Sequence, residues 1–473
     1  MLGSAGLLTL VTLLGLVAGL GREWLLVASW GAGARTDGFL IALFIPEALR
    51  IILAGGLLSS AWMALYQERS EPERVAWLGR VTFCVGLLGL MLALVLSFGA
   101  EWWVRLVGPG LAPQLRPVTQ EALQILAWTV PGLLLQALWS VPLQAQGRFL
   151  LAGLSSLVYN LPVVIYLALH QAQSLEPSLA WTFVVGSVAT ALLMVPAVRA
   201  HGLVLRAIRW HAPTVRELST RVGPLLGSAL MGQGLMLLER MVASYLGEGV
   251  VTVLNLARKL VNLPLVALMS VNQVLLGLMS KGAAADRLPL LRQGLALNTL
   301  VTTPAAVGLL LSAQAIVALL FPNVQGTAIL APLLGWYAVA LVLAGWNTLL
   351  ARYNYAAGDT RLPFVCETSG NVAQAIALPL LAWLHGAQGM AMALLLGVLV
   401  NGGLLLHFNR LWTSVRLPTL VLAGGLSLGL SAAFLLPWWP SAPLIRLAAS
   451  SAAGLFCLLT LAVWLKPWKP VPA

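Results

Sequence analysis

Long apolar runs separated by short polar stretches fill the whole chain. The runs reach about 20 residues, the length an α-helix needs to cross the hydrocarbon core of a bilayer. Because lipid offers no partner to backbone polar groups, such runs predict spanning helices rather than barrel strands. We predict about fourteen spans, at residues 4–28, 36–65, 76–99, 119–144, 152–170, 178–199, 219–246, 250–280, 291–315, 328–351, 362–384, 387–408, 418–436 and 444–465.

The second and eighth predicted spans are longer than a bilayer requires. Helices of this length tilt, bend or extend past the membrane. In the second span, Pro46 and the pair Gly55-Gly56 are residue types at which a helix bends. We therefore expect the second span to be bent.

Composition supports a membrane protein, and no catalytic constellation appears in the sequence. The chain is 60% hydrophobic and 9% charged, with a mean hydropathy of +0.92, whereas soluble domains carry about 25% charged residues. Cys84, Cys366 and Cys457 lie inside apolar runs without metal-site spacing, so we interpret them as small buried hydrophobic residues. The sequence contains neither a P-loop nor an HExxH motif. We predict no enzyme activity, no metal site and no cofactor.

The net charge of +12 follows a topological pattern. Basic residues gather in every second loop, for example between the second and third spans and between the sixth and seventh. Cytoplasmic loops of membrane proteins carry such an excess, so we expect both termini to be cytoplasmic and no nucleic-acid partner. The first apolar run has no basic segment before it, so we expect a retained helix rather than a signal peptide.

A repeated pattern divides the chain near its middle. Residues 23–30 (EWLLVASW) resemble residues 239–245 (ERMVASY), and Asn160 and Asn371 occupy similar later places. Six spans separate the equivalents, which predicts a parallel repeat about an axis along the membrane normal. We predict an N-terminal six-helix bundle at 1–203, a cytoplasmic amphipathic linker at 204–218, a second bundle at 219–410, and two further helices with a cytoplasmic tail at 411–473. An ordinary linker at 205–218 is the alternative.

Charged residues occur within the first, second, seventh and eighth spans, which the repeat makes equivalent in pairs. A charge at the bilayer centre costs about 2.5–3.5 kcal/mol on insertion scales, so these residues are expected to face a watery cavity or one another. Basic groups outnumber acidic ones, and arginine binds phosphate oxygens in pairs. The pattern therefore predicts a cavity for an anionic head group. Its residues are Arg22, Glu23, Asp37, Glu47, Arg50, Glu239, Arg240, Arg258 and Lys259.

Purely structural roles are open for several of these residues. Arg22-Glu23 and Glu239-Arg240 are candidates for ion pairs that hold the bundle together. Asp37 follows a Gly-Ala-Gly turn and is placed to cap the second span. Arg258 and Lys259 are adjacent cations that point in different directions and cannot neutralise each other, so at least one of them needs an anion from elsewhere.

Several motifs resemble one known family. The segment RE-x3-VASWGAGARTDGFLIALFIPEALR, followed by GGLLSSA, resembles the first two helices of the MurJ/MviN family of lipid II flippases, within the multidrug/oligosaccharidyl-lipid/polysaccharide exporter superfamily. QAQGRF, ERMVAS, NLARKLVNLP and RYNYAAGDTRLP follow in the family's order. The resemblance implies an all-α polytopic membrane protein with two pseudo-symmetric six-helix bundles plus two C-terminal helices. It also implies the flipping of a polyprenyl-diphosphate-linked saccharide across the bacterial inner membrane by alternating access.

The charge pattern and the resemblance together suggest two groups of site residues. We assign substrate binding to Arg22, Arg50, Arg258 and Lys259, and charge balance or gating to Glu23, Asp37, Glu47, Glu239 and Arg240. The chain departs from the family pattern at Leu16 and Ile51, where the family has arginines. At Arg258, Lys259 and Asn262 the family typically has Asp-Arg with a Glu three residues later.

The expected partners are the lipid bilayer and a polyprenyl-diphosphate-linked glycan, with enzymes of glycan synthesis as candidates and a monomer as the expected state. Coupling to the membrane potential or to a monovalent cation is open. Three alternatives are kept: a flippase for an exopolysaccharide repeat unit rather than lipid II, a cation-coupled small-molecule exporter, and a non-transporting scaffold for glycan synthesis.

Overall fold

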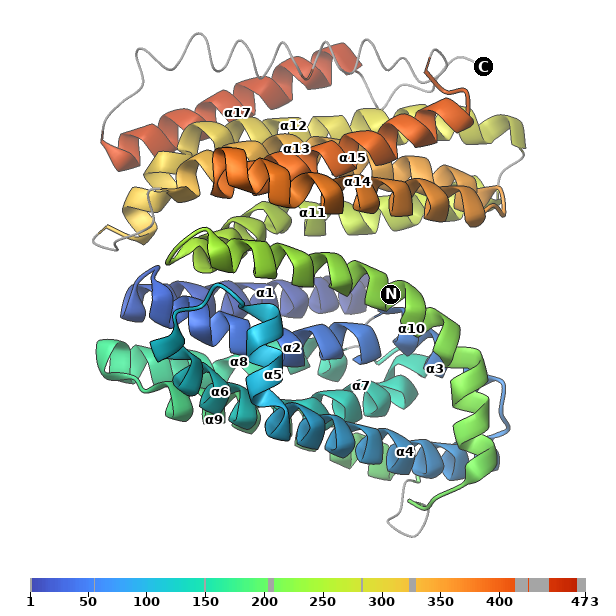
Figure 1. Ribbon diagram of the computed structural model, residues 1–473. Helices are drawn as coiled ribbons and strands as arrows, with labels where there is room; N and C mark the ends of the chain where they lie inside the picture. Colours follow the sequence, from blue (N-terminus) through green and yellow to red (C-terminus); the bar gives the residue numbers. More distant parts are fainter. Residues whose placement is uncertain are drawn as a thin grey trace. The chain divides into compact units, whose positions relative to one another are not determined.

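The computed structural model describes residues 2–54, 56–148, 150–202, 208–281, 284–322, 329–412, 424 and 442–465 (Figure 1). These residues form helices and connecting turns, with no strand among them. Eight helical segments of this described part are long and apolar enough to cross a membrane. The predicted all-α architecture is confirmed.

The chain divides between Thr252 and Val253 into two compact units, and each is described by itself. The first unit holds α1 (Leu2–Trp30), α2 (Ala34–Ala54), α3 (Gly56–Gln67), α4 (Glu71–Phe98), α5 (Ala100–Val107), η1 (Pro113–Leu115), α6 (Arg116–Leu126), α7 (Thr129–Ala145), α8 (Leu150–His170), η2 (Gln171–Gln173), α9 (Glu176–Ala200), α10 (Ala212–Tyr245) and the first turn of α11 (Val250–Lys281).

The second unit holds the rest of α11 and five further described helices. These are α12 (Ala284–Leu320), α13 (Leu330–Ala356), α14 (Arg361–His385), α15 (Ala387–Phe408) and α17 (Pro443–Leu465). The predicted thirteenth span, at 418–436, lies outside the described residues apart from Gly424.

Within the second predicted span, helix α2 ends at Ala54 and α3 begins at Gly56, while Pro46 lies inside α2. Pro46 removes one backbone donor but leaves the helix continuous. The bend expected at the pair Gly55-Gly56 stays a prediction, because Gly55 lies outside the described residues.

One element of the first unit was not predicted. Helix α5 is a short amphipathic segment whose neighbouring Trp102 and Trp103 rings meet edge to face, with centroids 4.5 Å apart. The predicted span at 119–144 is also divided, into α6 and α7, at Ala127 and Trp128. Both features are too short to leave a strong periodic signal in an apolar chain.

Helix α10 is a continuous helix of 34 residues. It begins at Ala212, so the second half of the predicted amphipathic linker is the start of this helix; residues 203–207 lie outside the described part. In the first unit α10 packs along α2 and α3 (Figure 1). Helix α10 belongs to the first compact unit, although the repeat assigns its residues from 219 onward to the second bundle. The bundle boundaries predicted from the repeat stay predictions.

Close helix packing in the first unit depends on small residues. A Cβ at Gly186 of α9 would lie 2.3 Å from the Tyr159 carbonyl oxygen of α8, and one at Gly132 of α7 would lie 2.8 Å from the Ser187 carbonyl oxygen of α9. Small residues let helix backbones approach closely, which is how membrane helices gain packing energy without a hydrophobic drive between them. These contacts hold α7, α8 and α9 together beside α1 and α2.

Candidate functional site

Arg22 is the centre of a buried charge cluster in the first unit. Its Nη2 atom donates to Glu23 Oε1 at 2.7 Å and to Glu47 Oε1 at 3.2 Å. The guanidinium also lies over the Phe183 ring, 5.0 Å from the centroid. Arg22 and Glu23 are 4% and 1% exposed. Arg22 is therefore a cation held between two carboxylates, one from its own helix and one from α2.

The turn between α1 and α2 brings these side chains together. Gly31 ends α1 with a φ of 81°, a left-handed conformation that glycine adopts without a steric penalty, and Thr36 Oγ1 donates to the Gly31 carbonyl at 2.6 Å. Arg35 donates to Glu176 at 2.5 Å and to the Ser174 carbonyl at 2.8 Å. The turn is thus fixed to the start of α9.

Arg50 differs from Arg22 in exposure and in partners. It follows Glu47 by three positions on α2, so both lie on one face of the helix. Arg50 is exposed, and no hydrogen bond or ion pair joins its side chain to another described residue. Next to it, Ile51 is 44% exposed. Arg50 is therefore available to an anion from outside the protein.

Helix α10 adds a second arginine to the cluster. Arg240 Nη1 donates to the Leu40 carbonyl at 3.3 Å, and its guanidinium lies 4.8 Å from the Phe44 ring centroid. It interacts electrostatically with Glu47, Glu23 and Asp37. The neighbouring Glu239 is buried, with 8% exposure, and it too has an interaction partner.

Asp37 caps a helix other than its own. Its Oδ2 accepts from the Gly249 amide at 2.7 Å, and its Oδ1 accepts from the Thr252 amide at 2.8 Å and the Thr252 hydroxyl at 2.6 Å. A carboxylate that accepts from amides at a helix N-terminus is stabilised by the helix dipole as well. The expectation that Asp37 caps the second span is wrong, because its acceptors are taken by the first turn of α11. We call Asp37, Gly249 and Thr252 the Asp37 cap.

The repeat explains why these residues meet. When the Val-Ala-Ser triplets at 27–29 and 242–244 are aligned, Asp37 falls opposite Thr252. The two equivalent turns touch: a Cβ at Gly249, whose φ is 83°, would lie 2.3 Å from the Ala32 carbonyl oxygen. The Gly110 amide also donates to Ser244 Oγ at 3.0 Å. The end of α10 is therefore bound closely to the first bundle.

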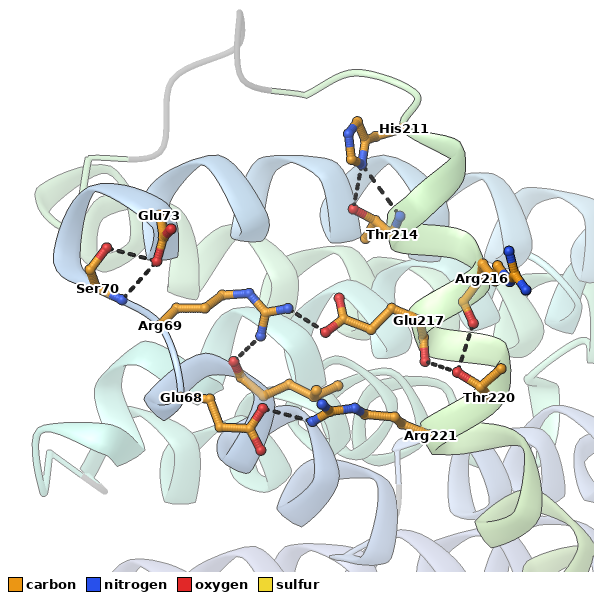
Figure 2. Close-up of polar contacts among 11 residues, drawn as sticks. Glu68, Arg69, Ser70, Glu73, His211, Thr214, Arg216, Glu217, Thr220 and Arg221 are labelled. Carbon is orange, nitrogen blue, oxygen red and sulfur yellow. Dashed lines mark hydrogen bonds and ion pairs between the residues drawn. The ribbon is translucent and has the colours of Figure 1, made fainter.

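Four charges hold the other end of α10. Figure 2 shows Glu68 and Arg69, at the corner between α3 and α4, facing Glu217 and Arg221 of α10. Arg69 pairs with Glu217, and Arg221 pairs with Glu68 at 2.7 Å. We call these residues the four-charge cluster. It lies at the end of α10 for which the basic loops predict a cytoplasmic location.

Two capped helix starts position the four-charge cluster. Ser70 and Glu73 form a capping box at the start of α4, and His211 accepts from the Thr214 amide at the start of α10 (Figure 2). The Arg69 guanidinium also lies 5.0 Å from the Trp77 ring centroid. Sequence reasoning counted these arginines as a topology signal only and missed the pairing, although Glu68 and Glu217 stand among them.

Arg258 and Lys259 lie half-buried on α11, in the second unit, and each is engaged in an interaction. Their predicted convergence with Arg22 and Arg50 stays a prediction. Within the described ranges, no group of three or more His, Cys, Asp or Glu side chains could hold a metal ion.

The first unit thus provides a buried arginine, Arg22, paired with the buried Glu23 and the partly exposed Glu47, and an exposed cation at Arg50. Breaking a buried ion pair costs about 3–5 kcal/mol when one charge is left unpaired. Arg22 can release a carboxylate only if another group replaces it. Such a site suits the exchange of one anion for another.

Comparison with known proteins identifies the family. The family model described as "Lipid II flippase MurJ" matches residues 26–436. The lipid II flippase MurJ of Burkholderia cenocepacia is 27% identical over 319 residues, which is 63% of this chain and 61% of that protein. The chain therefore spans under two thirds of this relative's length. The probable lipid II flippase MurJ of Vibrio cholerae is 25% identical over 445 residues, which is 88% of this chain and 85% of that protein.

Solved structures show the same fold. A structure of lipid II flippase MurJ in an inward closed conformation superposes with a TM-score of 0.81 at 19% identity, covering 98% of this chain and 99% of that one. An inward-facing multidrug resistance MATE family transporter of the MOP superfamily gives 0.69 at 14% identity, covering 86% and 95%. The family match extends over most of the sequence. The chain is a multi-pass membrane protein and belongs to the MurJ family.

Proposed function

We propose that this protein flips a polyprenyl-diphosphate-linked saccharide, lipid II by the names of its relatives, from the inner to the outer leaflet of the bacterial inner membrane. The proposal rests on one observation above all. Arg22 is held between Glu23 and Glu47, while Arg50, one helical turn beyond Glu47, is exposed and has no ion pair with another described residue. A diphosphate needs an accessible cation for its first contact. It also needs a second cation that can exchange a carboxylate partner for a phosphate.

The geometry suggests an order of events. The diphosphate first contacts Arg50, whose planar fork binds two phosphate oxygens at once. It then competes with Glu47, the longer and more exposed of the two contacts to Arg22. A released Glu47 still has the positive field of Arg240 nearby. The protein can therefore accept the anion without leaving a buried charge unpaired.

Alternating access needs contacts that open and close at both ends of α10. The Asp37 cap and the four-charge cluster are such contacts in the first unit. With the predicted orientation, release of the four-charge cluster admits the lipid from the cytoplasm. Release of the Asp37 cap lets the head group leave on the other side. Asp37 then acts in gating and not in substrate binding.

The alternatives are less well supported. The relatives are lipid II flippases rather than small-molecule exporters. A scaffold needs charges that are all mutually paired, whereas Arg50 of α2 has no ion pair with any other residue that the structure describes. An inside-negative potential favours outward movement of an anion by about 2.3 kcal/mol per charge per 100 mV. The membrane potential is therefore the first candidate for the driving force of transport, and coupling to a monovalent cation is the second.

Complementation with matched arginine variants tests the proposal. Cells depleted of their own lipid II flippase would receive the wild type, Arg50→Ala, Arg50→Lys or Arg105→Ala, with expression in the membrane measured by blotting. Arg105 is an exposed arginine of the same unit, paired with Glu101 on α5. We expect growth with the wild type and Arg105→Ala, none with Arg50→Ala, and weak growth with Arg50→Lys, which keeps the charge but loses the fork.

Two outcomes would count against the proposal. Equal growth with Arg50→Ala and the wild type would show that no diphosphate depends on Arg50. Failure of the well-expressed wild type to rescue would argue against lipid II as the cargo.

A further inference from the structure

A groove in the second unit is not used by the proposed transport site. It has a volume of about 500 Å³ and lies between α12, α13 and α17. Its lining is mainly apolar, including Leu310, Leu311 and Val339, and it includes Trp336 and Arg446. A cavity of this size falls within the usual range for small-ligand sites.

The groove lies next to the packed interface of α12 and α17. A cluster of Val307, Leu311, Cys457 and Leu461 holds these two helices together, and Leu311 also lines the groove. Toward the start of α17, Leu444 and Ile445 are 70% and 61% exposed, as expected of side chains in contact with lipid. Arg446, the next residue, lines the groove instead. A single cation is thus directed into an apolar groove.

Arg446 has no counter-ion among the described residues of its unit. Its Nε atom is buried without a hydrogen-bond partner, and no ion pair joins it to another described residue. The only acidic residues from 253 to 473 are Asp286, Asp359 and Glu367. Asp286 precedes Gln314 of the groove by roughly 40 Å along α12, at 1.5 Å per residue. Asp359 follows the far end of α13, and Glu367 of α14 interacts electrostatically with Tyr355 near that same end.

An unpaired charge in a membrane protein is costly unless an anion compensates it. In a bilayer the available anion is a lipid phosphate, which lies at the interface, where tryptophan is also favoured. The apolar part of the groove then accepts an acyl chain. We propose that the groove between α12, α13 and α17 binds an anionic phospholipid, with its phosphate on Arg446 and an acyl chain against Leu310, Leu311 and Val339.

This site is separate from the flipping proposal and is tested without transport. The full-length protein, purified in detergent, would be titrated with phosphatidylglycerol or phosphatidylcholine, and bound lipid would be counted by native mass spectrometry. We expect one phosphatidylglycerol to bind about tenfold more tightly than phosphatidylcholine, because the choline cation of phosphatidylcholine offsets the attraction of its phosphate to Arg446.

Three variants isolate the contacts. Arg446→Gln should abolish the preference for phosphatidylglycerol, and Arg446→Lys should retain most of it. Val339→Phe, which fills the groove, should weaken binding of both lipids. Arg361→Gln, an exposed arginine at the start of α14, is the control and should leave binding unchanged.

Two results would overturn the assignment. One is an undiminished preference for phosphatidylglycerol in Arg446→Gln. The other is displacement of the bound phospholipid, one for one, by undecaprenyl diphosphate, which would make the occupant an isoprenoid lipid.

Discussion

The two ends of α10 are held to the first bundle by different kinds of contact. At one end, Asp37 is a single anion, 4% exposed, that accepts three hydrogen bonds from neutral donors of Gly249 and of Thr252 in the first turn of α11. At the other end, the four-charge cluster consists of two ion pairs. The side chains of Glu68 and Arg221 are 53% and 54% exposed there, and those of Arg69 and Glu217 are 19% and 25% exposed.

This difference predicts unequal strength. Exposed ion pairs contribute about 0–1 kcal/mol because water and salt screen them. A buried carboxylate that satisfies amides is harder to replace, since each donor left unsatisfied costs about 1–3 kcal/mol. The four-charge cluster should therefore open far more readily than the Asp37 cap. In the predicted orientation, the end that admits the substrate is the weaker one.

The largest effect is expected from Asp37→Ala. The substitution leaves two buried amides and a hydroxyl without their acceptor, so opening of this turn should become about 3 kcal/mol easier, close to a hundredfold in amide exchange. Hydrogen exchange measured by mass spectrometry on peptides covering 246–254 reports this directly. Asp359→Ala is the matched control, because Asp359 caps the Arg361 and Leu362 amides at an exposed helix start.

Asp359→Ala should cost only about 1 kcal/mol, as for an ordinary helix cap. Asp37→Asn keeps an acceptor oxygen but loses the charge, so its exchange should fall between the wild type and Asp37→Ala. If Asp37→Ala and Asp359→Ala changed exchange equally in their own helices, the Asp37 cap would not be the stronger contact.

A smaller effect is expected from Gly249→Ala. The added Cβ would meet the Ala32 carbonyl oxygen at 2.3 Å, and the φ of 83° is strained for alanine. The combined cost should be about 1–3 kcal/mol. Exchange should increase in peptides covering both turns, Gly31–Gly33 and Leu246–Gly249. In Gly247→Ala the added Cβ would have no atom within 4 Å, so this variant measures the cost of backbone strain without the clash.

The smallest effect is expected in the four-charge cluster. In a double-mutant cycle of Glu68→Ala and Arg221→Ala, the coupling energy should be below about 1 kcal/mol and should shrink as salt is raised. Thermal unfolding in low and high salt provides the measurement. A coupling that exceeds the Asp37 effect, or that is unchanged by salt, would reverse the comparison.

Most of the helices could be predicted from the sequence, because each is a long apolar run ended by polar residues. The predicted span at 76–99 corresponds to α4 (Glu71–Phe98), for example. Helix α5 was missed because eight residues of amphipathic helix give little periodic signal beside long spans.

The site was predictable in part. The density of charges in the first two spans marked Arg22, Glu23 and Glu47, which do contact one another. The partners of Asp37 are more than two hundred positions away, so local cap rules could not find them; the aligned Val-Ala-Ser triplets were the available signal. The four-charge cluster was missed because loop arginines also serve topology, and sequence alone does not separate the two roles.

The proposed transport depends most on Arg50 as the accessible cation for a diphosphate-linked lipid. The direct measurement is flipping of fluorescent lipid II in vesicles that contain the purified protein, with Arg50→Ala compared with Arg105→Ala. We expect flipping by the wild type and by Arg105→Ala, and loss of flipping in Arg50→Ala at equal reconstitution. Flipping by Arg50→Ala at the wild-type rate would contradict this role of Arg50.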